Sequence, residues 1–560
     1  MTDHPPGQAP GRSLQNLARA LRGPERIAPA GPVRVVPPAP AAPSLLAAIA
    51  PGAAPRAHRA SIALPPDPDR AAYPPPWTWP ALHRPEDAAI RHDGAVTTFA
   101  ALDAAARDLS AALAARAIGR GDVVAFLGHN HPSQIVALMA CSRLGAALLP
   151  LNWRLAPPEL GFILQDAAAR LVLALPGYAP LAESLAPPGM PPGDYVMDPT
   201  APLPAGQAGV APGTAEDPAL VVYTSGTTGR PKGAVLDGAA VVANARNAVR
   251  VFDLTAEDHV LTVLPMFHVG GLCIQTLPAL MVGATVTLHS RFDAEAWFDA
   301  VEREGPSLSL LVPAIMAALI AHPNWAGADL SALRAVGAGS SDVPAPLAEA
   351  FHAKGVPVQG IYGATETGPI ALAQSPAEAL ADPGGIGRAA PLCEVRVQDE
   401  AGHPLPPGRI GEIAVRGPNL MRGYLRDPEG TAAAIRDGWF RTGDAAQLDA
   451  SGRYRLAGRI GDVIISGGEN VYPAEVERVL MTAPGITDGA VCGVPNPRWG
   501  EVPVAVVVPG PGYDPEAVLR HFEGKLARFK QPHHVVTVTA LPRTALGKVE
   551  RAALRALATA

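Results

Sequence analysis

Two kinds of hydrophobic pattern alternate along most of this chain. Short continuous apolar runs, bounded by glycine or proline, predict buried strands, and longer segments with apolar residues at helical spacing predict helices. Helices are predicted at 99–115 and 132–145, and strands at 122–127, 146–150, 171–175, 219–222, 261–264, 309–312 and 333–336. Because strands and helices alternate, we expect layered α/β architecture with parallel sheets.

The pattern changes twice toward the C-terminus. Short strands with glycine and proline turns between Val395 and Leu456 predict a separate β subdomain. Beyond Arg459 come strands at 463–465, 488–494 and 502–508 and helices at 473–481 and 514–526. They predict a compact α+β unit of about a hundred residues, a usual domain size. We place the boundary at 459–462, which gives domains 81–459 and 460–560.

Two segments depart from this alternation. Residues 1–80 hold almost a third of the 63 prolines, so we expect a largely disordered extension, with one short amphipathic helix possible at 13–21. Residues 269–288 form an uncharged run that is long enough to span a membrane. Glycines and Pro278 interrupt it, and its end alternates like a strand. We therefore predict a loop, a short buried helix and a strand, and no integral membrane segment.

Composition narrows the class of protein. The 560 residues are too many for one ordinary domain, and 48% apolar content supports large cores. A net charge of −6 without a basic cluster gives no indication of a nucleic-acid partner. The four cysteines are far apart and lack metal-ligand spacing, which predicts reduced, buried thiols in a cytoplasmic protein. No secretory signal pattern is seen at the N-terminus.

The most informative motif follows the apolar run 219–222. Residues 223–233 read Tyr-Thr-Ser-Gly-Thr-Thr-Gly-Arg-Pro-Lys-Gly, so glycines, hydroxyls and one lysine follow a strand. Glycines let backbone N–H groups turn toward an anion, which predicts a phosphate cradle. It lacks the Gly-x-x-x-x-Gly-Lys pattern of the common nucleotide loop, and a flexible surface loop is the other interpretation. The candidate phosphate ligands are Thr224, Ser225, Gly226, Thr227, Thr228, Gly229 and Lys232.

Five further motifs carry candidate chemistry. They lie at 264–271, 360–368, 438–444, 458–462 and 541–548. Each is ambiguous alone. His268 fits a core histidine, Asp444 a turn residue and Lys548 a solvated surface lysine. Tyr362 fits a core position, whereas Glu366 in its glycine-rich turn fits a structural or a functional role equally well.

In their joint order, and over about residues 85–555, the six motifs resemble the adenylate-forming superfamily, specifically its acyl-CoA synthetase branch. The resemblance implies an α/β fold: a large N-terminal domain of two layered α/β subdomains plus a β subdomain, followed by a small mobile α+β C-terminal domain. It implies a two-step reaction. A small-molecule carboxylic acid attacks the α-phosphate of ATP to give acyl-AMP, and a thiol, usually that of CoA, then displaces AMP.

The resemblance also implies a role for each motif. The 224–232 loop would hold the β- and γ-phosphates, Thr365 would bond the α-phosphate, and Glu366 would hold Mg²⁺. Tyr362 would stack on adenine, and Gly363, Gly337, Ala338 and Gly339 would line the same cleft. Asp444 would accept the ribose hydroxyls, and Arg459 would reach the ribose or a phosphate. Lys548 would bridge the substrate carboxylate and the α-phosphate, offsetting charge.

The remaining implied roles concern the acid, the thiol and the hinge. His268 would be the gate beside the carboxylate, and Gly467 and Gly468 would line the CoA tunnel. Gly461 occupies the hinge position, where many relatives carry a charged residue, so a charged hinge contact is absent. Gly-Ala-Gly-Ser-Ser at 337–341 also departs from the usual motif, which affects pocket shape more than adenylation.

The substrate stays open at this stage. Pocket candidates are mostly small or apolar, which suits an apolar acid; they are His268, Val269, Cys273, Gln275, Gly337, Gly360, Ile361 and Ile370. We expect an ATP-dependent acid:CoA ligase acting on a fatty or other apolar acid. The alternatives are an aromatic acid–CoA ligase, a ligase that loads a carrier protein, and a non-catalytic ligand-binding homologue. The expected oligomeric state is a monomer or a homodimer.

Overall fold

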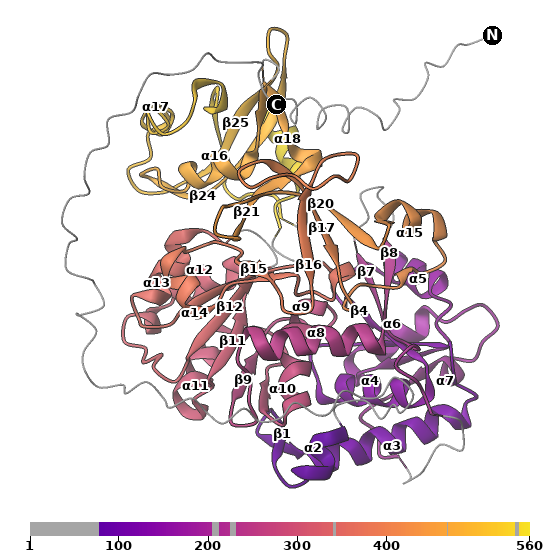
Figure 1. Ribbon diagram of the computed structural model, residues 1–560. Helices are drawn as coiled ribbons and strands as arrows, with labels where there is room; N and C mark the ends of the chain where they lie inside the picture. The colour runs from indigo at the N-terminus through magenta and orange to yellow at the C-terminus, as the bar shows by residue number, and fades with distance from the viewer. Residues whose placement is uncertain are drawn as a thin grey trace, which may run out of the picture.

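Two mainly parallel sheets form the core of the larger part of the molecule, which is coloured indigo to pink in Figure 1. The computed structural model describes residues 78–203, 212–224, 231–339, 343–466, 469–543 and 548–559. The sequence predicts a largely disordered extension over residues 1–80. Residues 1–77, which include the segment 13–21 where a helix is considered, lie outside the described residues. In the described part of the chain, no helix is long and apolar enough to cross a membrane.

The seven-stranded sheet has the order β18-β8-β7-β4-β3-β5-β6. Its strands are β3 (Val123–Leu127), β4 (Ala147–Leu151), β5 (Leu171–Ala174), β6 (Val196–Met197), β7 (Pro218–Thr224), β8 (Lys232–Asp237) and β18 (Gly423–Tyr424). The strands from β7 to β6 along this order are parallel, whereas β8 pairs antiparallel with both β7 and β18. The accompanying helices are α3 (Phe99–Ala115), α4 (Pro132–Leu144), α5 (Pro157–Asp166), α6 (Ala179–Ser184) and α7 (Pro192–Tyr195).

The nine-stranded sheet has the order β15-β14-β13-β12-β11-β9-β10-β1-β2. Its strands are β1 (Ala88–His92), β2 (Ala95–Thr98), β9 (His259–Thr262), β10 (Thr285–Leu288), β11 (Leu308–Leu311), β12 (Ala335–Gly339), β13 (Val358–Tyr362), β14 (Leu372–Ala373) and β15 (Arg388–Ala389). The strands from β13 to β1 are parallel, and those beyond them at the two edges are antiparallel. The flanking helices are α2 (Thr78–His83), α11 (Ala294–Glu304), α12 (Pro313–Ala321), α13 (Ala345–His352) and α14 (Pro376–Ala381).

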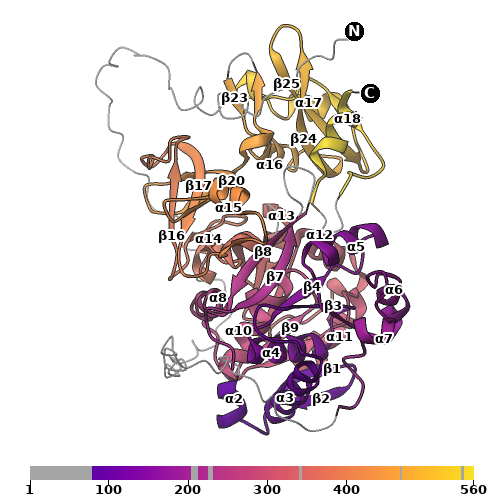
Figure 2. The same cartoon turned by 90° about the vertical axis from the view of Figure 1, so that its right-hand side faces the viewer.

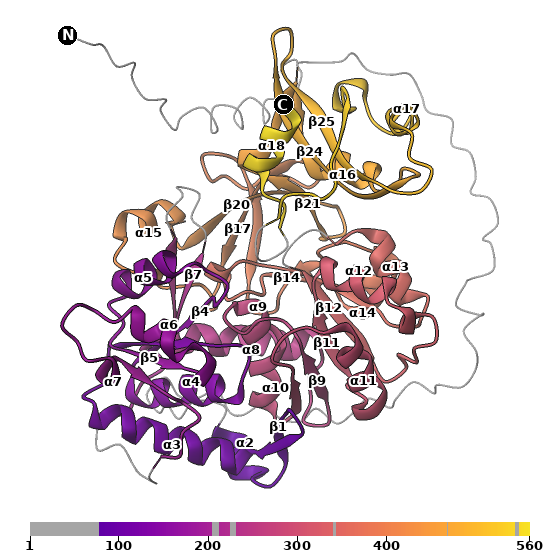
Figure 3. The same cartoon turned by 180° about the vertical axis from the view of Figure 1, so that it is seen from behind.

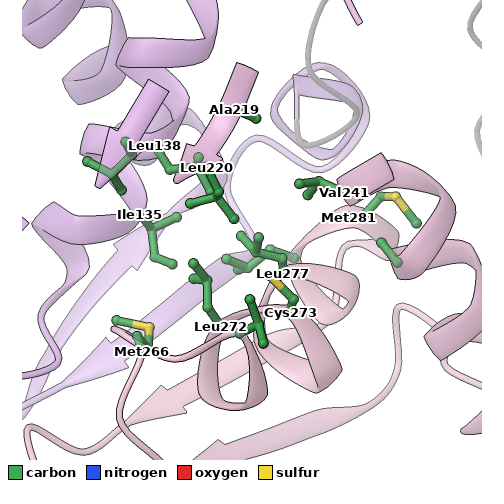
Figure 4. Packing of buried hydrophobic residues seen from close by; sticks show 14 of the residues in the cluster. Ile135, Leu138, Ala219, Leu220, Val241, Met266, Leu272, Cys273, Leu277 and Met281 are labelled. Carbon is green, nitrogen blue, oxygen red and sulfur yellow. The ribbon is translucent and has the colours of Figure 1, made fainter. Parts of the chain in front are cut away.

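A buried helical layer lies between the two sheets. It consists of α8 (Gly238–Val251) and a stretch that follows the His268 loop: α9 (Val269–Gly271), the π-helix η3 (Leu272–Thr276) and α10 (Leu277–Val282). Figure 4 shows Leu272 and Leu277 of that stretch packing toward Ile135 and Leu220. The apolar run 269–288 is therefore buried helix from Val269 to Val282 and then strand β10, so the helix and the strand are found as predicted, whereas the loop predicted at its start is not.

A β subdomain lies between the larger part and the C-terminal part (orange in Figure 1). Its strands are β16 (Glu394–Gln398), β17 (Ile410–Arg416), β19 (Ile435–Arg436), β20 (Trp439–Leu448) and β21 (Tyr454–Arg459), and α15 (Pro428–Ala434) precedes β19. All of these strands pair antiparallel. The β subdomain predicted between 395 and 456 is confirmed.

The C-terminal part has a sheet and a hydrophobic core of its own, and it lies above the rest in Figures 2 and 3. Its strands are β22 (Ile464–Ser466), β23 (Glu469–Val471), β24 (Ile486–Asn496), β25 (Gly500–Pro509) and β26 (Val535–Thr537). Its helices are α16 (Pro473–Leu480), α17 (Pro515–Arg520) and α18 (Arg551–Thr559).

Three predicted elements differ from the structure. The helix predicted at 514–526 ends at Arg520, and turns follow up to Gly524, whose φ of +71° is incompatible with a continuing helix. The strand predicted at 261–264 runs from His259 to Thr262, because the chain leaves the sheet before Pro265. The strand predicted at 333–336 runs from Ala335 to Gly339.

Candidate active site

The carboxylate predicted to bind ribose meets two of the other predicted residues. Asp444 lies on β20 directly opposite Arg459 of β21, and Arg459 Nε is 2.9 Å from Asp444 Oδ1. Tyr362, at the end of β13, donates its hydroxyl to Asp444 Oδ2 at 2.8 Å. Burial, and next the charge of Asp444, raise the pKa of Tyr362 well above its ordinary value, so the phenol stays protonated and donates. The structure thus brings together Tyr362 with two motifs that lie about 80 to 100 residues further along the chain.

The turn after Tyr362 is formed by close backbone packing. A Cβ on Gly363 would lie 1.7 Å from the carbonyl oxygen of Pro369, so no side chain fits there. Gly339, at the end of the neighbouring strand β12, is constrained in the same way by the carbonyl of Ile361 at 2.3 Å. Gly337 and Ala338 lie on the same buried strand. Two of the predicted cleft glycines are therefore required by the fold itself.

Glu366 lies in a short 3₁₀-helix, Thr365–Thr367, that follows this turn, and it is buried. Its Oε1 accepts a hydrogen bond from the Tyr424 hydroxyl at 2.9 Å. The Glu366 carboxylate and the Thr365 hydroxyl are hard oxygen donors, which suit Mg²⁺. Among the described residues no group of three or more His, Cys, Asp or Glu could hold a metal ion. A magnesium ion held by one carboxylate together with substrate phosphates needs no such group.

Lys232 is the described cation of the phosphate loop. It lies opposite Thr224 where β7 and β8 pair, so the loop joins the ends of a two-stranded antiparallel pair. Its Nζ is 2.8 Å from Asp427 Oδ2 and 5.0 Å from the centre of the Tyr424 ring. The hydrogen bond from Lys232, and next that from the Gly430 amide, lower the pKa of Asp427. The other predicted loop residues, Ser225, Gly226, Thr227, Thr228 and Gly229, lie outside the described residues, as do Gly467 and Gly468.

Lys548 belongs to the C-terminal part, but charged residues of the larger part affect its pKa. Burial and the positive charge of Arg459 lower the pKa of its ammonium, while Asp444 and then Glu366 oppose that shift. Lys548 in turn helps to lower the pKa of His268. Charges of Asp444, Arg459 and Glu366 therefore affect the pKa of Lys548 across the boundary between the two parts.

His268 lies where the β9 loop enters α9, and its ring centroid is 4.3 Å from that of Phe267. Its Nε2 is buried and has no hydrogen-bond partner in the described part of the chain. Burial above all, and then the charges of Lys548 and Arg154, lower the pKa of His268 to about 3. The imidazole is therefore neutral at physiological pH and can give or accept one hydrogen bond at that nitrogen.

Several residues at the site were missed by the sequence analysis. Tyr424 and Asp427 hold Glu366 and Lys232, and the only local signal is a tyrosine just before an Asp-Pro helix start. Asn130 fixes the His268 loop by donating to the Leu264 carbonyl at 2.9 Å and accepting from the Met266 amide at 2.8 Å. No local pattern indicates the role of Asn130, because its partners lie more than 130 residues away.

The family models decide the family. The model described as AMP-binding enzyme matches residues 77–425, and that described as AMP-binding enzyme C-terminal domain matches residues 475–548. The chain belongs to the AMP-binding enzyme family. The resemblance drawn from the six motifs is confirmed, and so is the acid–CoA ligase branch: the protein is an AMP-forming acid–thiol ligase. Its predicted use of ATP, Mg²⁺ and CoA is confirmed with it.

Individual relatives support this assignment. The chain is 45% identical to indoleacetate–CoA ligase of Aromatoleum aromaticum, over 84% of this chain and 95% of that one. It is 41% identical to feruloyl-CoA synthase of Amycolatopsis sp, over 85% and 98%. Among solved structures, ATP-bound MatB from Rhodopseudomonas palustris matches with a TM-score of 0.77 and 32% identity, over 84% of this chain and 95% of that one. These similarities also confirm the predicted α/β fold with a large N-terminal and a smaller C-terminal domain.

Proposed function

We propose that this ligase activates an aromatic carboxylic acid through an acyl-adenylate and transfers the acyl group to CoA. The aromatic class is supported by the relatives that act, by their names, on indoleacetate and ferulate, at 45% and 41% identity. A long-chain-fatty-acid–CoA ligase of Mycobacterium tuberculosis is only 34% identical. The aromatic alternative of the sequence analysis is therefore preferred here over a fatty acid.

The roles of the site residues follow from charge. In the first half-reaction a carboxylate anion approaches the polyanionic triphosphate, so positive groups must gather at the α-phosphate. Lys548 and Arg459 would supply two of them, and the contacts of Asp444 with Arg459 and Tyr362 are the observation that carries this proposal. Mg²⁺ held by Glu366, when bound, would offset further phosphate charge.

The remaining residues orient the substrates. Asp444 accepts from the ribose hydroxyls once they replace Tyr362 and Arg459 as its partners. Lys232 holds the outer phosphates after leaving Asp427. Neutral His268 directs its unpartnered Nε2 at the acid's carboxylate, and its burial keeps water from that group.

The second half-reaction requires Lys548 to leave. We place the domains at 81–459 and 460–560, with residues 460–462 as the hinge and Gly461 as the residue that absorbs the backbone change. A rotation there would withdraw Lys548 and bring the loop with Gly467 and Gly468 toward the thioester. We place the reaction in the cytoplasm, where the free cysteines of the protein would stay reduced.

A panel of acids tests the substrate class. The enzyme is incubated with ATP, Mg²⁺, CoA and one arylacetic, arylpropenoic, benzoic or fatty acid at a time, and CoA thioesters are quantified by mass. We expect the highest kcat/KM with an arylacetic or arylpropenoic acid. A higher value for any fatty acid would contradict the aromatic class, and acyl-AMP that forms but is not converted to a thioester by added CoA would indicate a different thiol acceptor.

A further inference from the structure

Two buried glutamines have amide atoms without partners among the described residues. Gln275 is 2% exposed and Gln359 is fully buried. Both amide atoms of Gln275 and the Oε1 of Gln359 have no hydrogen-bond partner among the described residues. Because buried polar atoms are nearly always paired in a folded protein, each such atom points to a partner supplied from outside the chain.

Gln275 is placed by an uncommon helix. It lies in the five-residue π-helix η3 that begins four residues after His268, and such π segments occur often at functional sites. Cys273 and Leu277 of this helical stretch belong to the packing shown in Figure 4. Gln275 is two residues, about half a turn, from each of them. Its side chain therefore projects from the other side of the helix, and η3 contacts β11 as well as α8.

Gln359 lies on the sheet next to these elements. Strand register aligns Leu310, Gly337 and Gln359 in one row across β11, β12 and β13. A Cβ on Gly337 would lie 2.9 Å from the Leu310 side chain and 3.1 Å from the Phe252 ring at the end of α8. Gln359 itself reaches α8, because its Nε2 donates to the Val251 carbonyl at 3.2 Å. An aromatic and an aliphatic side chain thus flank the row in which Gln359 lies.

The orientation of the Gln359 amide is fixed by its partners. Nε2 also donates to the Gln374 carbonyl at 2.8 Å, so both of its partners are acceptors. The nitrogen must occupy that position, and the remaining atom is the carbonyl oxygen. An oxygen of this kind can only accept, so the group that pairs with it must carry an N–H or an O–H.

We propose that Gln359, assisted by Gln275, selects aromatic acids that carry an N–H or O–H donor at the end of the ring system remote from the carboxylate. This inference rests on the proposed aromatic substrate class. Gln359 precedes Tyr362, at the nucleotide end of β13, by three residues, or about 10 Å of strand. A one- or two-ring acid spans such a distance from the α-phosphate to the row of Gln359. A hydrocarbon ring would leave the glutamine oxygen unpaired and would be selected against.

Matched acids test the proposal. The kcat/KM for CoA-thioester formation is measured with 4-hydroxyphenylacetate against 4-fluorophenylacetate, and with 4-hydroxycinnamate against 4-fluorocinnamate. Each pair differs by the donor while keeping a similar shape. We expect the wild-type enzyme to prefer the donor acid of at least one pair by roughly ten- to a hundredfold. The ratio within one protein cancels effects on folding and on ATP binding.

Variants then test whether Gln359 and Gln275 cause the preference for the donor acid. Gln359→Met should bring the preferred ratio close to one, and Gln275→Met should lower it by a smaller factor. Gln398→Met is the matched control, since Gln398 is 2% exposed and hydrogen-bonded on β16 of the β subdomain; it should keep the wild-type ratio. If Gln359→Met does not fold, the wild-type ratio and Gln275→Met still decide.

Two outcomes would overturn the proposal. The first is a wild-type ratio of kcat/KM values near one in both pairs of acids. The second is a Gln359→Met enzyme that keeps the wild-type preference. Both would leave the proposed aromatic class intact. Turnover of fatty acids without turnover of any aryl acid would instead refute the proposed substrate class, and this inference with it.

Discussion

The proposed nucleotide side and the proposed acid side of the site differ in how their polar groups are paired. On the nucleotide side, Asp444 is paired with Tyr362 and Arg459, Glu366 with Tyr424, and Lys232 with Asp427. On the acid side, His268 Nε2, the Gln275 amide and Gln359 Oε1 are buried without partners in the described part of the chain. The first set of groups is paired without a substrate, whereas under the proposed function the acid would provide partners for the second set.

This difference indicates how each substrate contributes. A nucleotide has to displace internal partners, so its binding exchanges one set of charged hydrogen bonds for another and gains little net energy from each. The acid has nothing to displace and fills unmet hydrogen-bonding capacity. The enzyme should therefore discriminate strongly against an acid that lacks the donor or acceptor with which one of these buried groups would pair.

The largest expected effect, on the rate of acyl-adenylate formation, comes from removing the positive charge of Lys548. Lys548→Ala should lower acyl-adenylate formation by roughly a hundred- to a thousandfold, because it removes a cation from the developing charge at the α-phosphate. Conversion of supplied acyl-AMP to the CoA thioester should change only a few-fold, since that step needs Lys548 withdrawn. Pyrophosphate release measures the first half-reaction, and thioester mass measures the second.

Lys525→Ala is the control for Lys548→Ala, because Lys525 belongs to the same domain and its ammonium lies at an exposed position, 2.7 Å from His521 Nε2. It should leave both half-reactions unchanged. Equal loss of both half-reactions in Lys548→Ala would show that Lys548 does not serve adenylation alone.

Local signals explain which parts of the molecule the sequence could predict. The helix 99–115 is found with the predicted bounds, because Thr98 caps it by accepting from the Ala101 amide and its apolar spacing is regular. The helix predicted at 514–526 is too long, because the positive φ of Gly524 depends on the surrounding structure rather than on periodicity.

The site shows the same division. Asp444, Arg459 and Tyr362 could be predicted because each lies in a recognisable motif. Tyr424 and Asp427 could not, since they reach Glu366 and Lys232 only through the two-residue strand β18 pairing with β8. Gln275 was a pocket candidate by position, but its unpaired amide emerges only from tertiary packing.

A smaller effect, on stability, should come from His268. Its pKa in the folded protein is about 3, below the ordinary value of 6.5, so the unfolded chain binds the proton more tightly. Stability from this group is complete above pH 6.5 and is lost as the pH falls toward 3. Lowering the pH from 8 to 5 should thus cost the wild type about 2 kcal/mol more than His268→Gln.

Urea denaturation of both proteins at the two pH values measures this cost. An equal loss in His268→Gln would show that His268 is not held neutral by the fold, and the acid side would then resemble the nucleotide side in carrying a charge.

The smallest effect concerns the ion pair that the nucleotide must displace. The Lys232 and Asp427 side chains are 27% and 34% exposed, so their pairing should contribute only about 0–1 kcal/mol. Asp427 also caps α15 by accepting from the Gly430 amide, a role that asparagine can keep. Asp427→Asn should therefore change stability by less than about 1 kcal/mol and lower the KM for ATP a few-fold, because Lys232 is released beforehand. Asp427→Ala should lose a further ~1 kcal/mol with the cap. Steady-state kinetics and urea denaturation separate these effects, and a tenfold rise in the KM for ATP in Asp427→Asn would mean that Asp427 helps to bind the nucleotide instead of competing with it.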